Sequence, residues 1–262
     1  MRDKVNIGSV QVDNVTLKEA LEEIEHLVTL RKPCYINSVN VDVVIRYNKD
    51  KEYAHFYDAG KLCIADGMLI LWAARFLGLS IIEKVSGSDL VTGICELAHN
   101  NGFKIFFLGG RPGAALSAKL KMQETFNTAD QITWYCPPYD FEKYSHELEK
   151  IARIVKRAKP DILLVGLGAP KREKWIKEYY RKLDVPVSLG VGASFEWIGG
   201  MLKRAPRWMQ NMGLEWLWRL LLEPRRLWRR YLIDDLPFFA LLLEQKLRQS
   251  KSYSTEIERE SG

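Results

Sequence analysis

The sequence of 262 residues has little of what metal-dependent and dinucleotide-dependent enzymes need. It contains 4 histidines, no Asp-x-Asp pair and no Cys/His cluster, so we expect no metal site. A dinucleotide-binding glycine pattern is incomplete, because Lys171 and Phe195 stand where a third glycine is required. No Walker-type phosphate loop is present either. We therefore expect no cofactor, and a nicotinamide oxidoreductase is a weaker alternative that NADH titration would test.

Long apolar runs and closely spaced cysteines are also missing. The cysteines at 34, 63, 95 and 136 form no Cys-x-x-Cys pair and are typical of free thiols in a reducing compartment. No run approaches the ~20 apolar residues that span a bilayer, and the stretch 236–243 is short and contains Pro237. Residues 1–10 lack an apolar core of signal-peptide length. We expect a cytoplasmic protein that is peripheral on the inner face of the cell membrane.

The sequence does contain a concentrated positive segment near its C-terminal end. Residues 200–230 hold eight basic residues against two glutamates, a balance equal to the +6 net charge of the whole chain, and five of the 8 tryptophans lie in or beside this segment. A solvated pair of amphipathic helices is one interpretation. Nucleic-acid binding is disfavoured, because no known module pattern accompanies the charge. A membrane-binding surface is favoured, because Trp prefers the headgroup level and Arg attracts anionic lipid and lipid diphosphate.

The hydrophobic pattern predicts an α/β fold. Apolar runs that do not alternate are followed by helical stretches, which is typical of a doubly wound, mostly parallel, Rossmann-like sheet with helices on both faces. We expect this catalytic domain over residues 1–198, a basic and aromatic helical appendage over 199–249, and a disordered polar tail over 250–262. The predicted strands are 34–39, 61–65, 104–108, 132–135, 161–165 and 187–191, preceded by a hairpin within 5–15 and a helix-capping box at 16–19.

Candidate site residues follow the predicted strands, where ligands bind in folds of this class. Ser38 and Asn40 follow the first strand and could cap a helix or bind ligand hydroxyls. Asp66, next to Gly67, could likewise cap a helix or act as a general base that accepts the proton of a substrate hydroxyl. Glycine turns at 109–110, 166–168 and 190–192 offer backbone amides to a phosphate group.

Taken together, these residues resemble the WecG/TagA/CpsF family of bacterial glycosyltransferases. The resemblance covers about residues 5–245. Its matching stretches are Ile36–Asn40, Ala65–Gly67, Ser86–Leu90, Phe107–Gly110, Gly168–Lys171 with Glu173, Gly190–Gly192, Arg204–Pro206, Leu214–Trp216 with Arg219, and Glu223–Pro224 with Arg226. Each stretch is weak evidence, but their order and spacing are specific.

The resemblance implies an inverting, metal-independent enzyme that moves N-acetylmannosamine from UDP-N-acetylmannosamine to undecaprenyl-diphosphate-linked N-acetylglucosamine, in teichoic acid or polysaccharide synthesis. It implies that Asp66 is the base and that Ser38, Asn40, Gly109 and Gly110 belong to the substrate pocket. It further implies that Glu196 contacts uridine, that Tyr139 stacks on the base, and that appendage arginines close over the diphosphate at the membrane. These arginines are Arg219, Arg226 and Arg229, with Arg230 on the same basic face.

Two departures from the family pattern leave the donor sugar open. Lys84 stands where the family usually has Arg, which keeps the charge and loses the bidentate fork. Arg172 stands where the family usually has Gln and adds a charge near the substrate. One alternative is the same reaction with another UDP-sugar, and a second is a non-catalytic membrane adaptor that binds a nucleotide. A homo-oligomer in solution is also compatible with the sequence.

Overall fold

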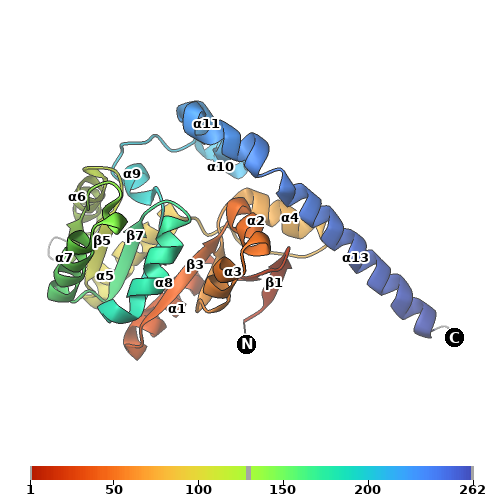
Figure 1. The fold of residues 1–262 in the computed structure, drawn as a ribbon, viewed down its shortest axis with the longest axis horizontal. Coiled ribbons are helices and arrows are strands. Elements are labelled where there is room, and N and C mark those ends of the chain that lie inside the picture. Colours follow the sequence, from red (N-terminus) through yellow and green to blue (C-terminus); the bar gives the residue numbers. More distant parts are fainter. Residues whose placement is uncertain (1, 128–130, 261–262) are drawn as a thin grey trace.

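The computed structural model describes residues 2–127 and 131–260, and the side chains at 211, 226 and 252–260 lie outside that description. Figure 1 shows an α/β body from which a long C-terminal helix projects. The chain begins with an antiparallel hairpin, β1 (Lys4–Ile7) and β2 (Val10–Asp13), and continues into helix α1 (Leu17–Leu30). The predicted capping box is confirmed, because Thr16 and Glu19 each accept a hydrogen bond from the other's backbone N–H.

Six parallel strands form the central sheet, in the order β4-β3-β8-β7-β5-β6. The strands are β3 (Cys34–Val39), β4 (Leu62–Ala65), β5 (Ile105–Gly109), β6 (Ile132–Tyr135), β7 (Ile162–Gly166) and β8 (Val187–Gly190). Because every pair is parallel, all six carboxyl ends meet at one edge of the sheet. The predicted sheet is thereby confirmed, with each strand within two residues of its expected bounds.

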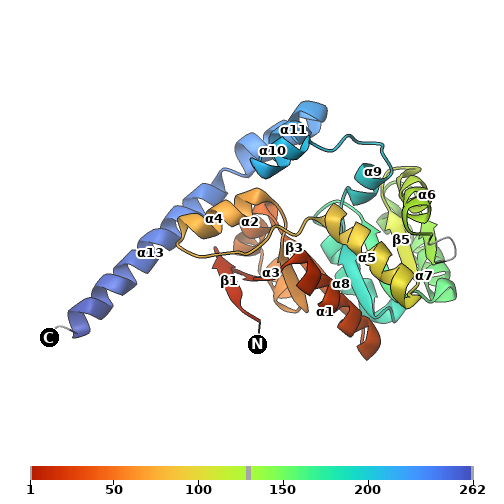
Figure 2. The same ribbon diagram turned by 180° about the vertical axis from the view of Figure 1, so that it is seen from behind.

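Helices cover both faces of the sheet, which explains the unbroken apolar strands. Tyr35 and Phe106 pack into the core on one face, and their neighbours Ile36 and Phe107 pack into the core on the other. Figures 1 and 2 show the two faces in turn. Helices α7 (Ser145–Ala158) and α8 (Lys171–Leu183) lie on the first face, and α1, α5 (Gly87–Asn101) and α6 (Ala114–Phe126) lie on the second.

Shorter helices complete the body. The helices α2 (Val41–Lys49), α3 (Lys51–Asp58) and α4 (Met68–Phe76) contact the hairpin, whereas the 3-10 turn η1 (Phe141–Lys143) packs with α7 and α9 (Ser194–Ile198) packs with α6. Asp50 separates α2 from α3 and caps α3 by accepting hydrogen bonds from the N–H groups of Glu52 and Tyr53. The cysteines are free, as expected, and burial raises the pKa of Cys34 to about 11.

The C-terminal part is helical and crosses the carboxyl edge of the sheet (Figure 1). It comprises α10 (Arg207–Asn211), α11 (Glu215–Leu222), α12 (Pro224–Arg229), the π-helical turn η2 (Arg230–Asp234) and α13 (Pro237–Glu260). Gln245 of α13 ties this part to the hairpin, because it accepts from the Gly8 N–H at 2.7 Å and donates to the Asn6 carbonyl at 3.0 Å. The side chains of Phe238 and Leu242 are buried in the core that also contains Tyr35 and Phe106.

The backbone of α13 is helical to Glu260. The disordered polar tail predicted over 250–262 stays a prediction. The division of the chain at residues 198 and 249 stays a prediction. Among the described residues, no helix has the length and apolar character needed to cross a membrane.

Candidate active site

A cavity of about 460 Å³ opens at the carboxyl ends of β3, β4, β7 and β8. The sheet contributes Ser38, Asp66, Gly166 and Gly190, and the appendage closes the opposite side. Seven of the predicted site residues line it, namely Ser38, Asn40, Asp66, Arg172, Glu196, Arg219 and Arg230. These come from both predicted parts of the chain, so the appendage completes the cavity.

Asp66 sits at the end of β4 with a carboxylate that no described residue binds. Its backbone N–H donates to the Val39 carbonyl at 2.8 Å, which continues the pairing of β3 with β4 and fixes its position. The following helix α4 begins after Gly67 without a side-chain cap, so Asp66 is not a helix cap. Within the part of the chain that the structure describes, no hydrogen bond or ion pair reaches its carboxylate, which therefore has free lone pairs facing the cavity.

The charges around Asp66 have opposing effects on its pKa. Burial raises the pKa above its ordinary value, and the Arg219 and Arg172 guanidinium groups act against that rise. Glu215 adds to the rise, and Lys84 opposes it. The result is a carboxyl group with a raised pKa, a property suited to accepting a proton.

Asn40 caps a helix, the first of the two alternatives that the sequence left open, and its binding of ligand hydroxyls stays a prediction. Its side-chain oxygen accepts from the Val43 N–H at 3.2 Å, so it caps α2. It also lines the cavity, where its amide nitrogen is still able to donate. Ser38 lines the cavity as well, and its carbonyl accepts from the Tyr57 hydroxyl at 3.3 Å.

A network of charges holds the appendage against the core beside Asp66. Arg204 donates to both carboxylate oxygens of Asp89, at 2.7 and 3.1 Å, and to the Ser86 hydroxyl at 3.3 Å. Glu215 of α11 lies between two cations, 3.7 Å from Lys84 Nζ and 3.9 Å from Arg204 Nε. Lys84 does not itself line the cavity, but its charge lowers the pKa of Asp66 and pairs with Glu215.

Two appendage arginines reach the cavity from different sides. Arg219 lies one turn after Glu215 on α11, and its guanidinium is 5.6 Å from the ring of Trp197. No described carboxylate lies within ion-pair distance of Arg219, and its buried Nε has no partner there. Arg230 is 3.8 Å from Asp42, which also pairs with Arg46 at 2.9 Å.

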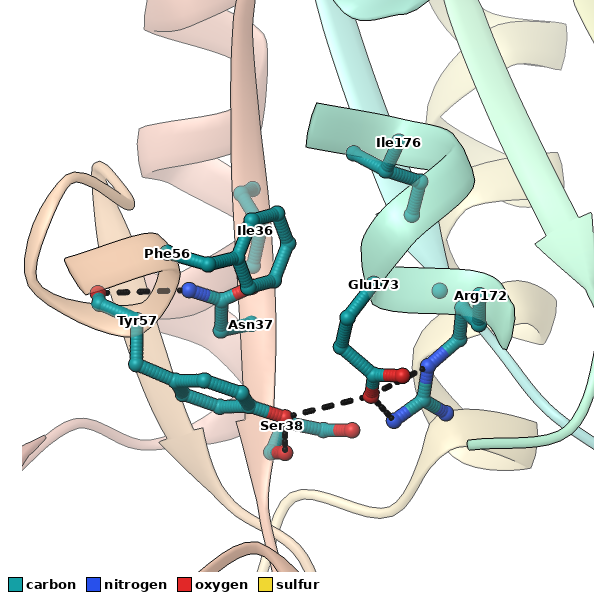
Figure 3. Close-up of a pocket in the computed structure, with 9 residues that line it drawn as sticks. Ile36, Asn37, Ser38, Phe56, Tyr57, Arg172, Glu173 and Ile176 are labelled. Atoms are coloured by element: carbon teal, nitrogen blue, oxygen red, sulfur yellow. Dashed lines mark hydrogen bonds and ion pairs between the residues drawn. The ribbon is translucent and has the colours of Figure 1, made fainter. Parts of the chain in front are cut away.

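Arg172 lines the cavity and is held by its neighbour Glu173 (Figure 3). Arg172 Nε and Nη2 lie 3.0 and 2.5 Å from Glu173 Oε1, and both side chains are buried. The extra charge that the sequence predicted at Arg172 is therefore offset by a carboxylate. The Tyr57 hydroxyl lies 3.4 Å from the same Glu173 oxygen.

Glu196 is buried with one oxygen satisfied and one oxygen free. Oε1 accepts from the Arg111 N–H at 2.9 Å, and Oε2 has no described partner. A buried carboxylate oxygen in the cavity wall without a donor is suited to a ligand that donates to it. The prediction that Glu196 contacts a nucleotide is compatible with this geometry and stays a prediction.

The remaining predicted site residues lie outside the cavity lining. Gly109 and Gly110 form the turn after β5 with positive φ angles of 89° and 81°. Tyr139 is 89% exposed and packs near Lys171, whose Nζ is 5.1 Å from its ring. Arg229 is largely exposed and 3.9 Å from Asp234, while the Arg226 side chain lies outside the described residues. Their proposed contacts with substrate stay predictions.

Sequence reasoning missed Glu173, Glu215 and Arg204 as site residues, although each falls in or beside a stretch that carried the resemblance. For Glu215 a signal was available, because it precedes Arg219 by four residues and shares its helix face. Glu173 pairs with its neighbour Arg172, but its second partner Tyr57 lies 116 positions away, and Arg204 lies 115 positions from Asp89. Among the described residues, no group of three or more His, Cys, Asp or Glu is arranged to hold a metal ion.

Comparison with known proteins identifies the family of this chain. An N-acetylglucosaminyldiphosphoundecaprenol N-acetyl-beta-D-mannosaminyltransferase of Bacillus subtilis (strain 168) is 26% identical over 255 residues, which cover 97% of this chain and 96% of the relative. A protein of the same name from Staphylococcus aureus (strain NCTC 8325 / PS 47) is 26% identical over 254 residues, 95% of each chain. The family model described as "Glycosyl transferase WecG/TagA/CpsF family" matches residues 5–252. With a match over nearly its whole length and an acid in a cavity at the sheet edge, this chain belongs to the WecG/TagA/CpsF family of glycosyltransferases.

Proposed function

We propose that this glycosyltransferase moves N-acetylmannosamine from UDP-N-acetylmannosamine to undecaprenyl-diphosphate-linked N-acetylglucosamine. The names of the relatives from Bacillus subtilis and Staphylococcus aureus support the acceptor and the transferred sugar. The product belongs to the synthesis of wall teichoic acid or a related surface polysaccharide. Transfer proceeds with inversion and without a metal ion.

The proposed reaction is a single displacement. The Asp66 carboxylate accepts the proton of an acceptor hydroxyl, and that oxygen forms a bond to the anomeric carbon of the donor sugar. The bond from this carbon to the diphosphate oxygen breaks, and UDP leaves with the electron pair. Because the hydroxyl attacks the face opposite the leaving group, the anomeric configuration inverts. Guanidinium groups and the backbone amides of the glycine turns offset the charge on UDP.

The observation that carries this proposal is the position of Asp66. It is a half-buried acid at the carboxyl end of β4, it has no described hydrogen-bond donor, and it shares its cavity with Arg172 and Arg219. A carboxylate used only for structure would be paired or would cap a helix, and Asp66 does neither. A general base needs such a free proton acceptor within reach of the reacting hydroxyl.

Replacement of Asp66 by Asn tests the base. We expect Asp66→Asn to lower kcat by about 10²–10⁴-fold, the usual contribution of a general base, with UDP affinity nearly unchanged. Transfer is measured with UDP-N-acetylmannosamine and a short polyprenyl-diphosphate N-acetylglucosamine acceptor, with product mass and anomeric configuration as readouts. Glu178→Gln removes an exposed carboxylate that pairs with Lys182 on α8 and serves as the control. A variant that keeps more than about a tenth of the activity would contradict the base role.

A panel of UDP-sugars distinguishes the alternatives. Transfer of another sugar with a higher kcat/KM would keep the reaction class and replace the donor. Binding of UDP without transfer to any lipid acceptor would favour the nucleotide-binding adaptor. A retained anomeric configuration would refute the single displacement.

We also propose that α10, α11 and α12 lie on the cytoplasmic membrane surface. Large apolar side chains are exposed on them next to basic residues, a combination suited to the headgroup region. The exposed apolar residues are Trp208, Met212, Leu221, Leu222 and Trp228.

Flotation with vesicles that contain anionic phospholipid tests this surface. The double variant Trp208→Ser/Trp228→Ser should float less than the native protein. The control is Leu120→Ser, because Leu120 is exposed on α6 and not on α10, α11 or α12. Equal loss in both variants would contradict the assignment of the surface. The predicted homo-oligomer is a separate matter and stays a prediction.

A further inference from the structure

Arg172 and Glu173 form a buried ion pair whose two ends face different surroundings. Arg172 lines the large cavity with Asp66 and also a small inner cavity of about 10 Å³. Glu173 lines only the inner cavity, and it is 3% exposed. The positive end of the pair therefore faces Asp66, and the negative end lies behind it.

The carboxylate end is anchored to the sheet through Tyr57. The Tyr57 ring is buried between α3 and β3, and its hydroxyl lies 3.4 Å from Glu173 Oε1 and 3.3 Å from the Ser38 carbonyl oxygen (Figure 3). Its single proton can be donated to either oxygen. Tyr57 thus connects the end of β3, where Ser38 lines the substrate cavity, with the first turn of α8.

The guanidinium end is directed by Gly190. A Cβ atom at Gly190 would lie 2.1 Å from Arg172 Cδ and 2.6 Å from its Nε, so the Arg172 stem passes over the glycine backbone. Arg172 Nη1 would lie 3.6 Å from a Cβ at Gly192, the next glycine of the turn. The absence of a side chain at Gly190 and the pull of Glu173 together fix the direction of the guanidinium group.

We propose that Glu173 and Tyr57 are positioning residues that hold the Arg172 guanidinium toward the cavity, where its charge stabilises the ionised form of Asp66. The inference rests on the proposed role of Asp66 as the base, which must be ionised to accept a proton. A cation fixed by a partner behind it stabilises an anion in front without forming an ion pair that would block its lone pairs. Arg172 therefore acts through Asp66.

Other charges also face Asp66, and they set the background for this effect. Arg219 and Glu215 come from α11, Lys84 from the segment before α5, and Arg204 from the segment before α10. Lys84 and Arg204 both lie beside Glu215, which offsets part of their charge. The carboxylate that offsets Arg172, Glu173, lies on the far side from the cavity. The charge of Arg172 therefore acts on Asp66 more directly than the charges of Lys84 and Arg204.

The pH dependence of kcat/KM tests the inference in the full-length enzyme. The acid limb should move to higher pH by about 1 unit in Arg172→Gln, since an opposite charge close to a carboxyl is worth that much or more. Arg172→Lys keeps the charge and should keep the limb near that of the native enzyme. The double variant Arg172→Gln/Glu173→Gln should move less than Arg172→Gln, because the unpaired buried carboxylate is removed as well.

Two further variants separate positioning from general damage. Tyr57→Phe should move the acid limb in the same direction by a smaller amount, because Glu173 loses one hydrogen-bond donor. Lys177→Gln removes a cation from the same helix, where Lys177 pairs with Glu52 at the surface 3.0 Å away, and should leave the limb in place. Coincident acid limbs in Arg172→Gln and the native enzyme, or a larger shift in the double variant, would overturn the proposal.

A readout without turnover separates this inference from the proposed function. The carboxyl carbon of Asp66, assigned with Asp66→Asn, is titrated by NMR in the native protein and in Arg172→Gln without substrate. A titration shifted to higher pH in Arg172→Gln supports the inference even where no sugar is transferred. An unshifted titration overturns it even where the native enzyme transfers N-acetylmannosamine as proposed.

Discussion

Replacing Arg204 by Met removes the ion pair between the appendage segment before α10 and the first turn of α5. Arg204 donates to both oxygens of Asp89 at 2.7 and 3.1 Å, and Ser86 donates to Asp89 as well. Burial acts to raise the pKa of Asp89, but the hydrogen bonds from Arg204 and Ser86 outweigh it and hold the pKa below its ordinary value. Methionine keeps most of the stem volume and removes the charge.

The magnitude of this interaction follows from its geometry and exposure. Hydrogen bonds to charged groups contribute about 1.5–3 kcal/mol when they are shielded, and exposed ion pairs about 0.2–1 kcal/mol. The two side chains are 32% and 34% exposed, between these limits. We therefore expect a coupling free energy of about 1–2 kcal/mol between Arg204 and Asp89.

A double-mutant cycle measures this coupling. Urea unfolding is followed for the native protein, Arg204→Met, Asp89→Asn and the double variant. The coupling free energy is the change in the free energy of unfolding of the double variant minus the sum of the changes of the two single variants. Because the folded pKa of Asp89 is lowered, the stabilisation is complete above the unfolded value of 3.8 and is lost as pH falls through the folded value. The coupling should therefore be the same at pH 7 and pH 5.

A coupling below about 0.3 kcal/mol at pH 7, within the range of independent sites, would refute this reasoning. A coupling free energy that already declines between pH 7 and pH 5 would also refute it. Such a decline would mean that a group other than Asp89 titrates in this range. The same variant should raise KM for the donor, since Glu215 and Arg219 depend on the position of the appendage. An unchanged KM with the expected coupling would limit Arg204 to a structural role.

Three further outcomes are expected. Gly190→Ala should lower the free energy of unfolding by about 1–3 kcal/mol in urea titrations, because the new Cβ would meet Arg172 Cδ at 2.1 Å; Gly168→Ala, where nothing lies within 4 Å, is the neutral control. Burial, with Asp42 and Asp234 adding to it, raises the pKa of Asp235 from 3.8 to about 6, so this group destabilises the fold as pH rises from 4 to 7. Asp235→Asn should therefore increase the free energy of unfolding at pH 8 by about 1–3 kcal/mol and change it little at pH 4, whereas the opposite pH trend would contradict the burial of this acid. Chelation with EDTA should leave the initial rate of transfer within about twofold, and a tenfold loss restored by Mg²⁺ would refute metal independence.

The sheet was predictable from sequence because its residues obey a local rule. Each strand buries both faces, so Phe106 and Phe107 are neighbours in the sequence and lie in different cores, and the run is apolar throughout. Asp66 was predictable for a related reason, since a polar residue before Gly67 marks the end of an apolar strand. The carboxyl edge of a parallel sheet then places it near Ser38 and Asn40.

The partners of the site residues were not predictable in this way. Tyr57 and Glu173 lie 116 positions apart, and Asp89 and Arg204 lie 115 apart, so no spacing rule connects them. Helical periodicity predicted that the appendage arginines lie on helices. It did not predict which side of each helix faces the core. Arg230 consequently faces the cavity while Arg229 faces solvent, although the sequence offered no reason to separate them.

The charge of the cavity shows why the appendage matters for a diphosphate ligand. Among the described side chains in its wall, the carboxylates outnumber the guanidinium groups: they are Asp42, Asp66, Glu196 and Glu215 against Arg172, Arg219 and Arg230. Arg172 and Arg230 each lie beside a carboxylate, so Arg219 has the least offset charge. A UDP-sugar with a negative diphosphate would therefore enter a cavity whose lining side chains carry a slight net negative charge.

In the proposed mechanism, the guanidinium groups and the glycine-turn amides of the wall offset part of the diphosphate charge, and further positive charge would come from outside the described wall. A divalent ion would supply it, but the metal-independent mechanism requires that protein cations do so instead. Arg225 and Arg229 of α12 are exposed and lie close in the sequence to Arg219 and Arg230, which line the cavity. The EDTA result and the position of the appendage are thus linked, because under the proposed metal-independent mechanism the appendage helices that we propose to lie on the membrane would supply further counter-charge to the donor.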